Sequence, residues 1–306
     1  MSSRKPLLAL AAALAMPGLG HVYLGDFVSG ASLLLAIGLT VPIFARLALW
    51  APSSWLCYVV LLGVVIALGL YVGSVRHAFR RAKQAPDVAL RSFQRPTVYA
   101  LYVAVGYIFV LEPVSAHVRE HWLETFVVPS ASMVPAVWPG DRFFADKTVG
   151  RSGGTKLERG AVVIFAYPND PRLTYVKRVV GLPGDRIEIA GSSVRVNGTD
   201  LTLGPAHDAF AALHGLTAMR EQGANGTYTV LWPGAAGAAG APQPATTYVV
   251  PSGSVFVLGD QRAHALDSRA FGPVPLANVK GIARQIWFSR APNEGVRWNR
   301  IGHLLG

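Results

Sequence analysis

The segment from Trp55 to Val75 constrains the fold more than any other part of this sequence, because its 21 residues include no charged side chain. A helix of about 20 apolar residues is long enough to cross the hydrocarbon core of a bilayer. The composition agrees with a membrane-embedded part: 51% of the residues are hydrophobic and 15% are charged, whereas soluble globular chains carry about 25% charged residues. The sequence therefore predicts at least one membrane-spanning helix.

Two further segments have the length and composition of membrane-spanning helices. Ser29–Trp50 is apolar except for Arg46, whose long side chain lies close enough to the segment end to reach the interface. Thr97–Val114 is apolar as far as Glu112. Together with Trp55–Val75, they give three predicted spans.

The first apolar run, Leu7–Met16, has ten residues and is too short to span a bilayer. A glycine-rich motif follows it, Pro17–Gly25. We expect a re-entrant or interfacial segment over 6–24. Arg4 and Lys5 precede the apolar run, so a cleaved targeting peptide is the alternative.

The loop between the second and third spans, 76–96, is strongly basic. It holds six Lys and Arg residues and a single acidic one, Asp87. Loops of this kind stay on the cytoplasmic side of a membrane. With three spans and a cytoplasmic N-terminus, 1–120 forms the membrane region and 121–306 lies outside the cytoplasm. The net charge of +11 is thus explained by the membrane flank, and nucleic acid is not expected as a partner.

From residue 121 onward, short β-branched and aromatic runs separated by turn residues predict a mainly β domain. This domain contains no cysteine and therefore no disulfide, because the one cysteine of the chain, Cys57, lies in the second span. A flexible insert is expected at about 203–246, where Gly234–Ala245 is rich in Ala, Gly and Pro. The predicted strands cover 161–165, 187–189, 194–196, 248–250, 255–258 and 285–288.

Two serines stand two residues apart in the segment Pro129–Pro135. On an extended segment, Ser130 and Ser132 project to the same face. One hydroxyl is then able to attack a carbonyl carbon while the other donates a hydrogen bond to the oxyanion. An ordinary turn is the alternative, since Ser and Pro are common in loops.

The run Tyr175–Asp185 places Lys177 between β-branched residues of a predicted strand. If the side chain points inward, burial disfavours its ammonium form, and a neutral lysine is able to act as general base for a serine hydroxyl. The alternative is a lysine at a strand edge in contact with water, where lysines usually lie.

These two segments and a third resemble the signature boxes of signal peptidase I, a family of serine endopeptidases with a Ser–Lys dyad. The boxes occur in the family's order behind membrane anchors, and weaker similarity covers nearly all of 125–302. The matching segments are Ser130–Pro135, Tyr175–Asp185, and Gly259–Arg262 with Asp267–Arg269.

The resemblance implies the roles of individual residues. Ser132 would be the nucleophile and Lys177 the general base. Ser130 would contribute its hydroxyl to an oxyanion hole, beside the backbone N–H of Ser132. Asp267 and Arg269 would form a supporting ion pair near the lysine, and Ser268 belongs to the same supporting set.

The resemblance also implies a fold, a substrate and a location. The catalytic domain would have the antiparallel β fold of signal peptidases. It would cleave N-terminal signal peptides from exported preproteins, after small residues in Ala-x-Ala-like sites. The enzyme would be a multi-pass protein of the cytoplasmic (inner) membrane, in contact with lipid, with the catalytic domain on the extracytoplasmic side and no cofactor.

The third box departs from the family pattern. Ala265 stands where the family has a serine whose hydroxyl helps to orient the lysine amine, and Gln261 replaces an asparagine. Losing one neutral hydrogen bond costs about 0.5–1.5 kcal/mol, which slows a reaction by roughly two- to tenfold. His264 or Ser268 is a candidate to compensate.

Other functions have less support in the sequence. No His-Glu-x-x-His motif or Cys/His cluster is present, so no metal is expected. A specialised peptidase for one substrate, such as a pilin, is a close alternative, and a catalytically weak paralogue that binds signal peptides is another. A self-cleaving Ser–Lys repressor would need a DNA-binding module, whereas this N-terminal part is apolar.

Overall fold

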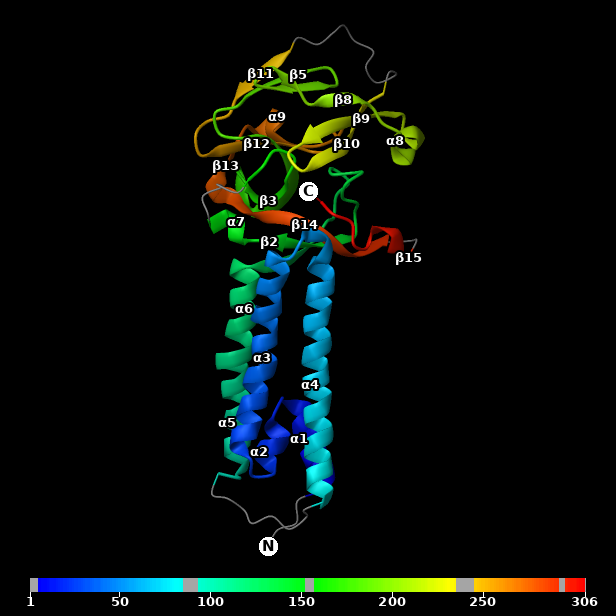
Figure 1. The fold of residues 1–306 in the computed structure, drawn as a ribbon. Coiled ribbons are helices and arrows are strands. Elements are labelled where there is room, and N and C mark those ends of the chain that lie inside the picture. Colours follow the sequence, from blue (N-terminus) through cyan, green and yellow to red (C-terminus); the bar gives the residue numbers. More distant parts are fainter. Residues whose placement is uncertain (1–4, 85–92, 152–156, 235–244, 292–294, 306) are drawn as a thin grey trace. The chain divides into compact units, whose positions relative to one another are not determined.

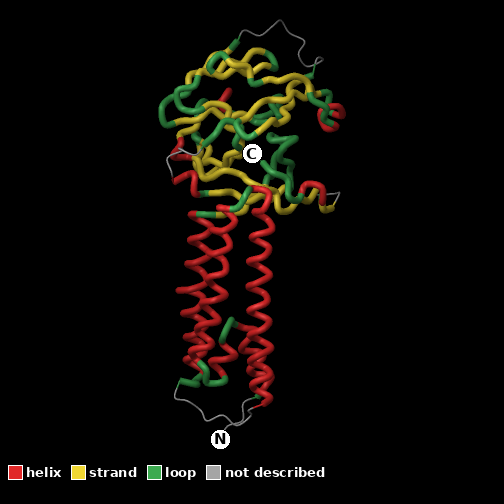
Figure 2. The backbone as a smooth tube through the Cα atoms, in the orientation of Figure 1, coloured by secondary structure: helices red, strands yellow, loops and turns green. Residues whose placement is uncertain are grey.

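The computed structural model describes residues 5–84, 93–151, 157–234, 245–291 and 295–305. The chain forms two compact units, Met1–Trp122 and Leu123–Gly306. Figure 2 shows helices in the first unit and mainly strands in the second. The predicted fold class, a mainly β domain preceded by a helical region, is confirmed.

Within the described residues, the helical unit contains three helical stretches that are long and apolar enough to cross a membrane: Phe27–Trp50, Ser53–Gln84 and Pro96–His121. They contain the three segments that the sequence predicts as spans, and the third continues beyond Val114. In chain order (Figure 1) the elements are α1 (Pro6–Ala15), α2 (Leu19–Tyr23), α3 (Phe27–Trp50), the 3₁₀ turn η1 (Ser53–Trp55), α4 (Leu56–Gln84), α5 (Pro96–Val105), the π-helical segment η2 (Gly106–Leu111) and α6 (Glu112–His121).

The glycine-rich motif Pro17–Gly25 forms the turn between α1 and α2, the whole of α2 and the two residues after it. Gly18 has a φ of 80°, and a Cβ added to it would lie 2.0 Å from the carbonyl oxygen of Gly30 in α3. Only glycine fits such a left-handed position at this backbone approach. The hydroxyl of Tyr102 in α5 contacts the carbonyl oxygens of Pro17 at 3.0 Å and Gly30 at 2.8 Å. The motif therefore joins α2, α3 and α5 at one point.

The second unit is built from three antiparallel sheets. One has the order β1-β2-β14-β3-β4-β12-β13 with β15 beside β14, another β10-β9-β8, and the third β11-β5-β6-β7. The strands are β1 (Leu123–Val127), β2 (Asp141–Asp146), β3 (Val162–Tyr167), β4 (Asp170–Gly181), β5 (Arg186–Ala190), β6 (Ser193–Val196), β7 (Thr199–Asp200), β8 (Thr202–Pro205), β9 (Leu216–Gly223), β10 (Gly226–Pro233), β11 (Thr246–Val249), β12 (Ser254–Leu258), β13 (Val274–Pro275), β14 (Val279–Ala291) and β15 (Gly295–Val296). Short helical elements lie between them: α7 (Thr148–Arg151), α8 (Ala209–Leu213), α9 (Ser268–Phe271), η3 (Leu276–Asn278) and η4 (Trp298–Arg300). Each of the six predicted strand segments overlaps one of these strands.

The segment predicted as a flexible insert, 203–246, has regular structure in its described part. β8, β9 and β10 form the three-stranded sheet, and α8 precedes β9. The loop prediction for Gly234–Ala245 falls almost entirely on 235–244, outside the described residues. The sequence did not indicate β9, because two of its inward-facing positions hold Glu221 and Gly223 rather than apolar side chains.

β4 is the strand that positions the candidate site. It pairs with β3 on one side from Asp170 to Arg178, and β12 covers its other side only from Arg178 to Gly181. Among the described strands, none pairs with that second side of β4 before Arg178. Lys177 is the last residue of this open edge, next to Arg178.

Candidate active site

Ser132 lies in a turn that follows β1. The turn is anchored by Met133 and Val137, which are buried in the core between β2, β3 and β14. The backbone N–H of Gln261 donates a hydrogen bond to the carbonyl oxygen of Ser132 at 3.2 Å. The serine is thus held by the buried side chains that follow it and by the backbone hydrogen bond from Gln261.

The hydroxyl of Ser130 lies beside that of Ser132, with 3.2 Å between the two oxygens. The sequence predicted this proximity from an extended segment, but the structure achieves it in a turn. Ser130 is exposed and Ser132 is half-buried, so both hydroxyls are within reach of a molecule bound at the surface.

Lys177 is 4% exposed, which agrees with an inward-pointing side chain rather than with a lysine in water. Its Nζ lies 2.7 Å from Ser132 Oγ and 3.1 Å from the carbonyl oxygen of Val176. Amine and hydroxyl, 45 residues apart in the sequence, are therefore in hydrogen-bond contact.

Burial lowers the pKa of Lys177 from its ordinary 10.5 to about 8. The carboxylates of Asp267 and Asp260 act in the opposite direction, because a negative charge favours the ammonium form. The desolvation effect is the larger of the two. An amine with a pKa of about 8 is neutral in a substantial fraction of molecules near neutral pH, which a general base requires.

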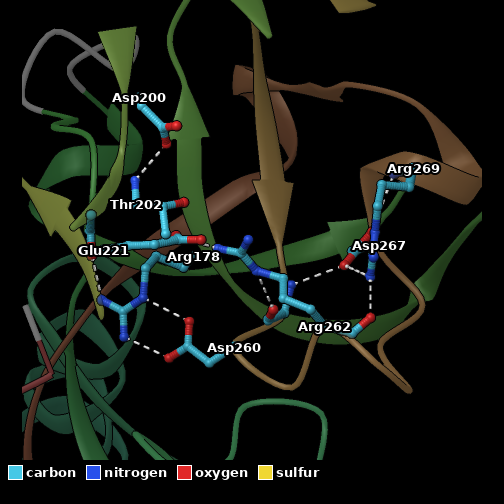
Figure 3. Close-up of polar contacts among 10 residues, drawn as sticks. Arg178, Asp200, Thr202, Glu221, Asp260, Arg262, Asp267 and Arg269 are labelled. Atoms are coloured by element: carbon cyan, nitrogen blue, oxygen red, sulfur yellow. Dashed lines mark hydrogen bonds and ion pairs between the residues drawn. The ribbon is translucent and has the colours of Figure 1, made fainter. Parts of the chain in front are cut away.

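The loop 259–263, which follows β12, is tied to β4 by a buried ion pair. Arg178, the residue after the lysine, binds both carboxylate oxygens of Asp260 at 2.7 and 2.6 Å and donates to the carbonyl oxygen of Gly160 (Figure 3). Bidentate pairs of this kind fix orientation as well as distance. Adjacent residues of β4 therefore serve different ends: Lys177 contacts the serine, and Arg178 fixes the loop.

Asp267 and Arg269 form the expected ion pair, with Arg269 Nε 2.9 Å from Asp267 Oδ1. The other carboxylate oxygen of Asp267 accepts a hydrogen bond from the backbone N–H of Gly259 at 3.0 Å. Ser268 Oγ accepts from the N–H of Val257 in β12 at 3.0 Å, so it contacts backbone rather than the lysine. These residues hold the loop 259–263 and the end of β12.

Ala265 and the stem of Lys177 both lie close to Gly259. A Cβ added to Gly259 would contact the Ala265 methyl and would lie 3.6 Å from Lys177 Cδ. Alanine supplies no hydroxyl at this position. His264, named from the sequence as a candidate to compensate, is exposed.

Sequence reasoning missed two contributors to the site. One is the carbonyl of Val176, which is a second partner for the amine. The other is Glu221 in β9, which binds Arg262 of the third box. A backbone carbonyl leaves no sequence signal, and Glu221 belongs to no motif.

Within the described ranges, no group of three or more His, Cys, Asp or Glu side chains could hold a metal ion. A cavity of about 460 Å³ lies beside Arg178 and Tyr228, but neither Ser132 nor Lys177 lines it.

Comparisons with known proteins agree with the resemblance seen in the sequence. Signal peptidase I of Pseudomonas fluorescens is 30% identical over 205 residues, which cover 56% of this chain and 66% of that protein. Signal peptidase I of Aquifex aeolicus is 29% identical over 204 residues, covering 56% of this chain and 78% of that protein. The match thus spans just under two-thirds of the Pseudomonas relative.

A crystal structure of a signal peptidase I from Enterococcus faecalis is 27% identical and covers 42% of this chain and 97% of that one, with a TM-score of 0.27. The family model for signal peptidase, peptidase S26, matches residues 97–288. That match covers more than half of the chain and includes all three boxes, so the chain belongs to the signal peptidase family, peptidase S26.

Proposed function

We propose that this protein is a membrane-bound serine endopeptidase that removes N-terminal signal peptides from exported preproteins. The observation that carries the proposal is the 2.7 Å contact between Lys177 Nζ and Ser132 Oγ, made by an amine whose pKa burial lowers to about 8. The family membership and the similarity to proteins named signal peptidase I support the choice of substrate.

In the first step, the neutral Lys177 amine takes the proton of the Ser132 hydroxyl as the oxygen attacks the scissile carbonyl carbon. Negative charge then develops on the carbonyl oxygen. The Ser130 hydroxyl and the backbone N–H of Ser132 are the groups placed to donate hydrogen bonds to it. The Lys177 ammonium next gives its proton to the leaving amine, which releases the mature protein and leaves an ester on Ser132.

Water completes the reaction by the same route. The amine of Lys177, neutral again, accepts a proton from a water molecule that attacks the ester, and the signal peptide leaves with a new carboxylate. The hydroxyl of Ser132 regains its proton from the ammonium. No cofactor takes part in these steps.

The open edge of β4 is the proposed place for the substrate. Tyr175 and Val176 precede the lysine on this edge, and an extended peptide is able to add to an uncovered strand by backbone hydrogen bonds. Such pairing would bring a carbonyl of the peptide to Ser132. Preference for small residues on either side of an x position, as in Ala-x-Ala, is a proposal that rests on the family resemblance.

We place the protein in the cytoplasmic membrane as a multi-pass protein. The three apolar helical stretches are long enough to span it, and the basic loop 76–96 favours a cytoplasmic position between the second and third. The catalytic unit would then lie on the extracytoplasmic side, where exported preproteins emerge. Contact with lipid follows from the spans.

The direct test is cleavage of a preprotein by the detergent-solubilised full chain, followed by intact mass of the products. Wild type should release the mature protein, and Ser132→Ala and Lys177→Met should each release none above background. Ser252→Ala, which removes an exposed hydroxyl in the turn before β12, is the matched control and should cleave as wild type does. Cleavage by Ser132→Ala at the wild-type rate would refute the proposal. Rates compared across several preproteins, including a pilin, separate a general enzyme from a specialised one.

A further inference from the structure

Glu221 is a fully buried carboxylate that belongs to none of the three boxes. It lies in β9, opposite Thr202 of β8 and Tyr228 of β10. Its Oε2 is 2.5 Å from Nη2 of Arg262, and both side chains are 0% exposed (Figure 3). A buried ion pair gains little stability over apolar side chains of similar size. Stability alone is therefore a poor explanation for this pair.

Arg262 connects Glu221 to the loop 259–263. Its Nε donates a hydrogen bond to the carbonyl oxygen of Gly259 at 3.0 Å, and its guanidinium lies 5.2 Å from the ring centre of Trp232 in β10. The carbonyl oxygen of Arg262 accepts from Arg269 at 2.8 Å. With Glu221 holding Nη2 of the guanidinium, Nε is aimed at the carbonyl oxygen of Gly259.

Gly259 is packed between the two residues of the dyad. A Cβ at this position would lie 2.7 Å from the carbonyl oxygen of Ser132 and 3.6 Å from Lys177 Cδ. Movement of Gly259 by a fraction of an ångström therefore acts on both residues. Its N–H is fixed by Asp267 and its carbonyl by Arg262.

β10 holds the same loop by its backbone. The N–H of Leu231 donates to the carbonyl oxygen of Asp260 at 2.7 Å, and the N–H of Ala263 donates to the carbonyl oxygen of Leu231 at 3.2 Å. The sheet formed by β8, β9 and β10 thus contacts the loop at the main chain through β10 and at a side chain through β9. The side-chain contact is the bond between the Glu221 carboxylate and Arg262, and a single substitution is able to remove it.

The buried charges around the loop are balanced. Glu221 and Asp260 are negative, Arg178 and Arg262 are positive, and each carboxylate has its own guanidinium partner. Asp260 is bound by Arg178 and so does not replace Glu221 as the partner of Arg262. Loss of the Glu221 charge leaves a buried guanidinium unpaired and free to turn away from Gly259.

We propose that Glu221 is a positioning residue of the Ser132–Lys177 dyad, acting through Arg262 and Gly259. The proposal rests on the function proposed above. Misplacement of a reacting group by about 1 Å is able to cost about 100-fold in rate. Substrate contacts made elsewhere are unaffected, so the loss should fall on kcat rather than on KM.

Three variants of the full chain, assayed with the same preprotein, test this. Glu221→Asp keeps the charge but withdraws it by one methylene, and should lower kcat about tenfold, with KM within about threefold of wild type. Glu221→Gln should lower kcat further, by about 100-fold. The double variant Glu221→Leu with Arg262→Leu replaces the pair by apolar side chains, and should regain the Tm of wild type but not its kcat.

The double variant separates positioning from stability. If kcat recovers together with Tm, the pair is only structural and the proposal is wrong. An unchanged kcat in Glu221→Asp would also overturn it, and this conservative variant decides the matter if the others fail to fold. Glu188→Gln, which removes a carboxylate paired with Arg186 at the surface, is the control and should leave kcat and Tm unchanged.

Failure of the proposed function gives a different result. If wild type and Ser132→Ala are equally active or equally inactive, the dyad itself is wrong. The Glu221 proposal alone fails when wild type cleaves, Ser132→Ala does not, and either Glu221→Asp keeps the wild-type kcat or the double variant recovers it.

Discussion

Replacing Lys177 by Met should stabilise the protein at pH 7 while abolishing cleavage. Burial lowers the pKa of Lys177 from 10.5 to about 8, and each pKa unit is worth about 1.4 kcal/mol. Holding the ammonium in the folded state therefore costs about 3 kcal/mol at pH 7. Methionine has a similar length and no charge, but it loses the hydrogen bonds of the amine to Ser132 and Val176, each worth about 1 kcal/mol. The net gain is about 1 kcal/mol, or roughly 2–4 °C in Tm for a domain of this size.

The pH dependence of this gain tests its cause. The pKa of Lys177 is lower in the folded than in the unfolded chain, so the unfolded state binds more protons between pH 8 and 10.5. Stability of the wild type therefore rises with pH across that interval. The advantage of Lys177→Met should be complete below pH 8, shrink from pH 8 to 10.5, and turn into a disadvantage above, where only the lost hydrogen bonds remain.

The assay is thermal unfolding of the detergent-solubilised full chain, followed by intrinsic fluorescence from pH 6 to 11. Ser132→Ala keeps the buried lysine and is the control: its Tm should follow the pH dependence of wild type. A difference between Lys177→Met and wild type that is constant with pH would refute the reasoning. So would a variant that is less stable than wild type at pH 7.

Four other outcomes follow from the structure. The cleavage rate should rise with pH about a midpoint near 8 as Lys177 loses its proton, and a steady-state profile that rises only above pH 10 would contradict a buried base. Ser130→Ala should lower kcat by about 100-fold with KM within about threefold, because a donor to the oxyanion is lost; equal kcat values would remove Ser130 from the mechanism. Ala265→Ser should leave cleavage equal or up to about tenfold faster, whereas a large loss would show that the third box is misaligned. Tyr102→Phe should destabilise the helical unit by about 1–3 kcal/mol, since two carbonyl oxygens lose their donor, and limited proteolysis within that unit at the wild-type rate would argue against it.

The dyad was predictable because its signals are local. Each of the segments around Ser132 and Lys177 carries a pattern that identifies it without knowledge of the fold. The sequence left the direction of Lys177 open between inward and water-facing, and the structure buries the side chain. The segment around Ser132 was expected to be extended and forms a turn, yet the predicted proximity of the two hydroxyls is found.

The surroundings of the dyad were less predictable because they depend on contacts between distant segments. Glu221 and Arg262 are 41 residues apart. Glu221 lies in β9, whereas Arg262 lies in the loop after β12. β9 was assigned to a flexible insert, since a strand is recognised by apolar alternation and a buried Glu221 interrupts it. A charged residue in a strand gives the same sequence signal whether it faces water or a buried guanidinium.

The alanine at 265 makes the position of Gly259 more important in this chain than the family pattern implies. With a serine at 265, a side-chain hydroxyl beside the lysine stem would help to orient the amine. Here the described partners of the Lys177 amine are Ser132 itself and the carbonyl of Val176, which lies on the same strand. The orientation of the amine then depends on how tightly its stem is packed, and Gly259 forms part of that packing. A chain without the hydroxyl should therefore be more sensitive to loss of Glu221, and Ala265→Ser should recover part of the kcat that Glu221→Asp loses.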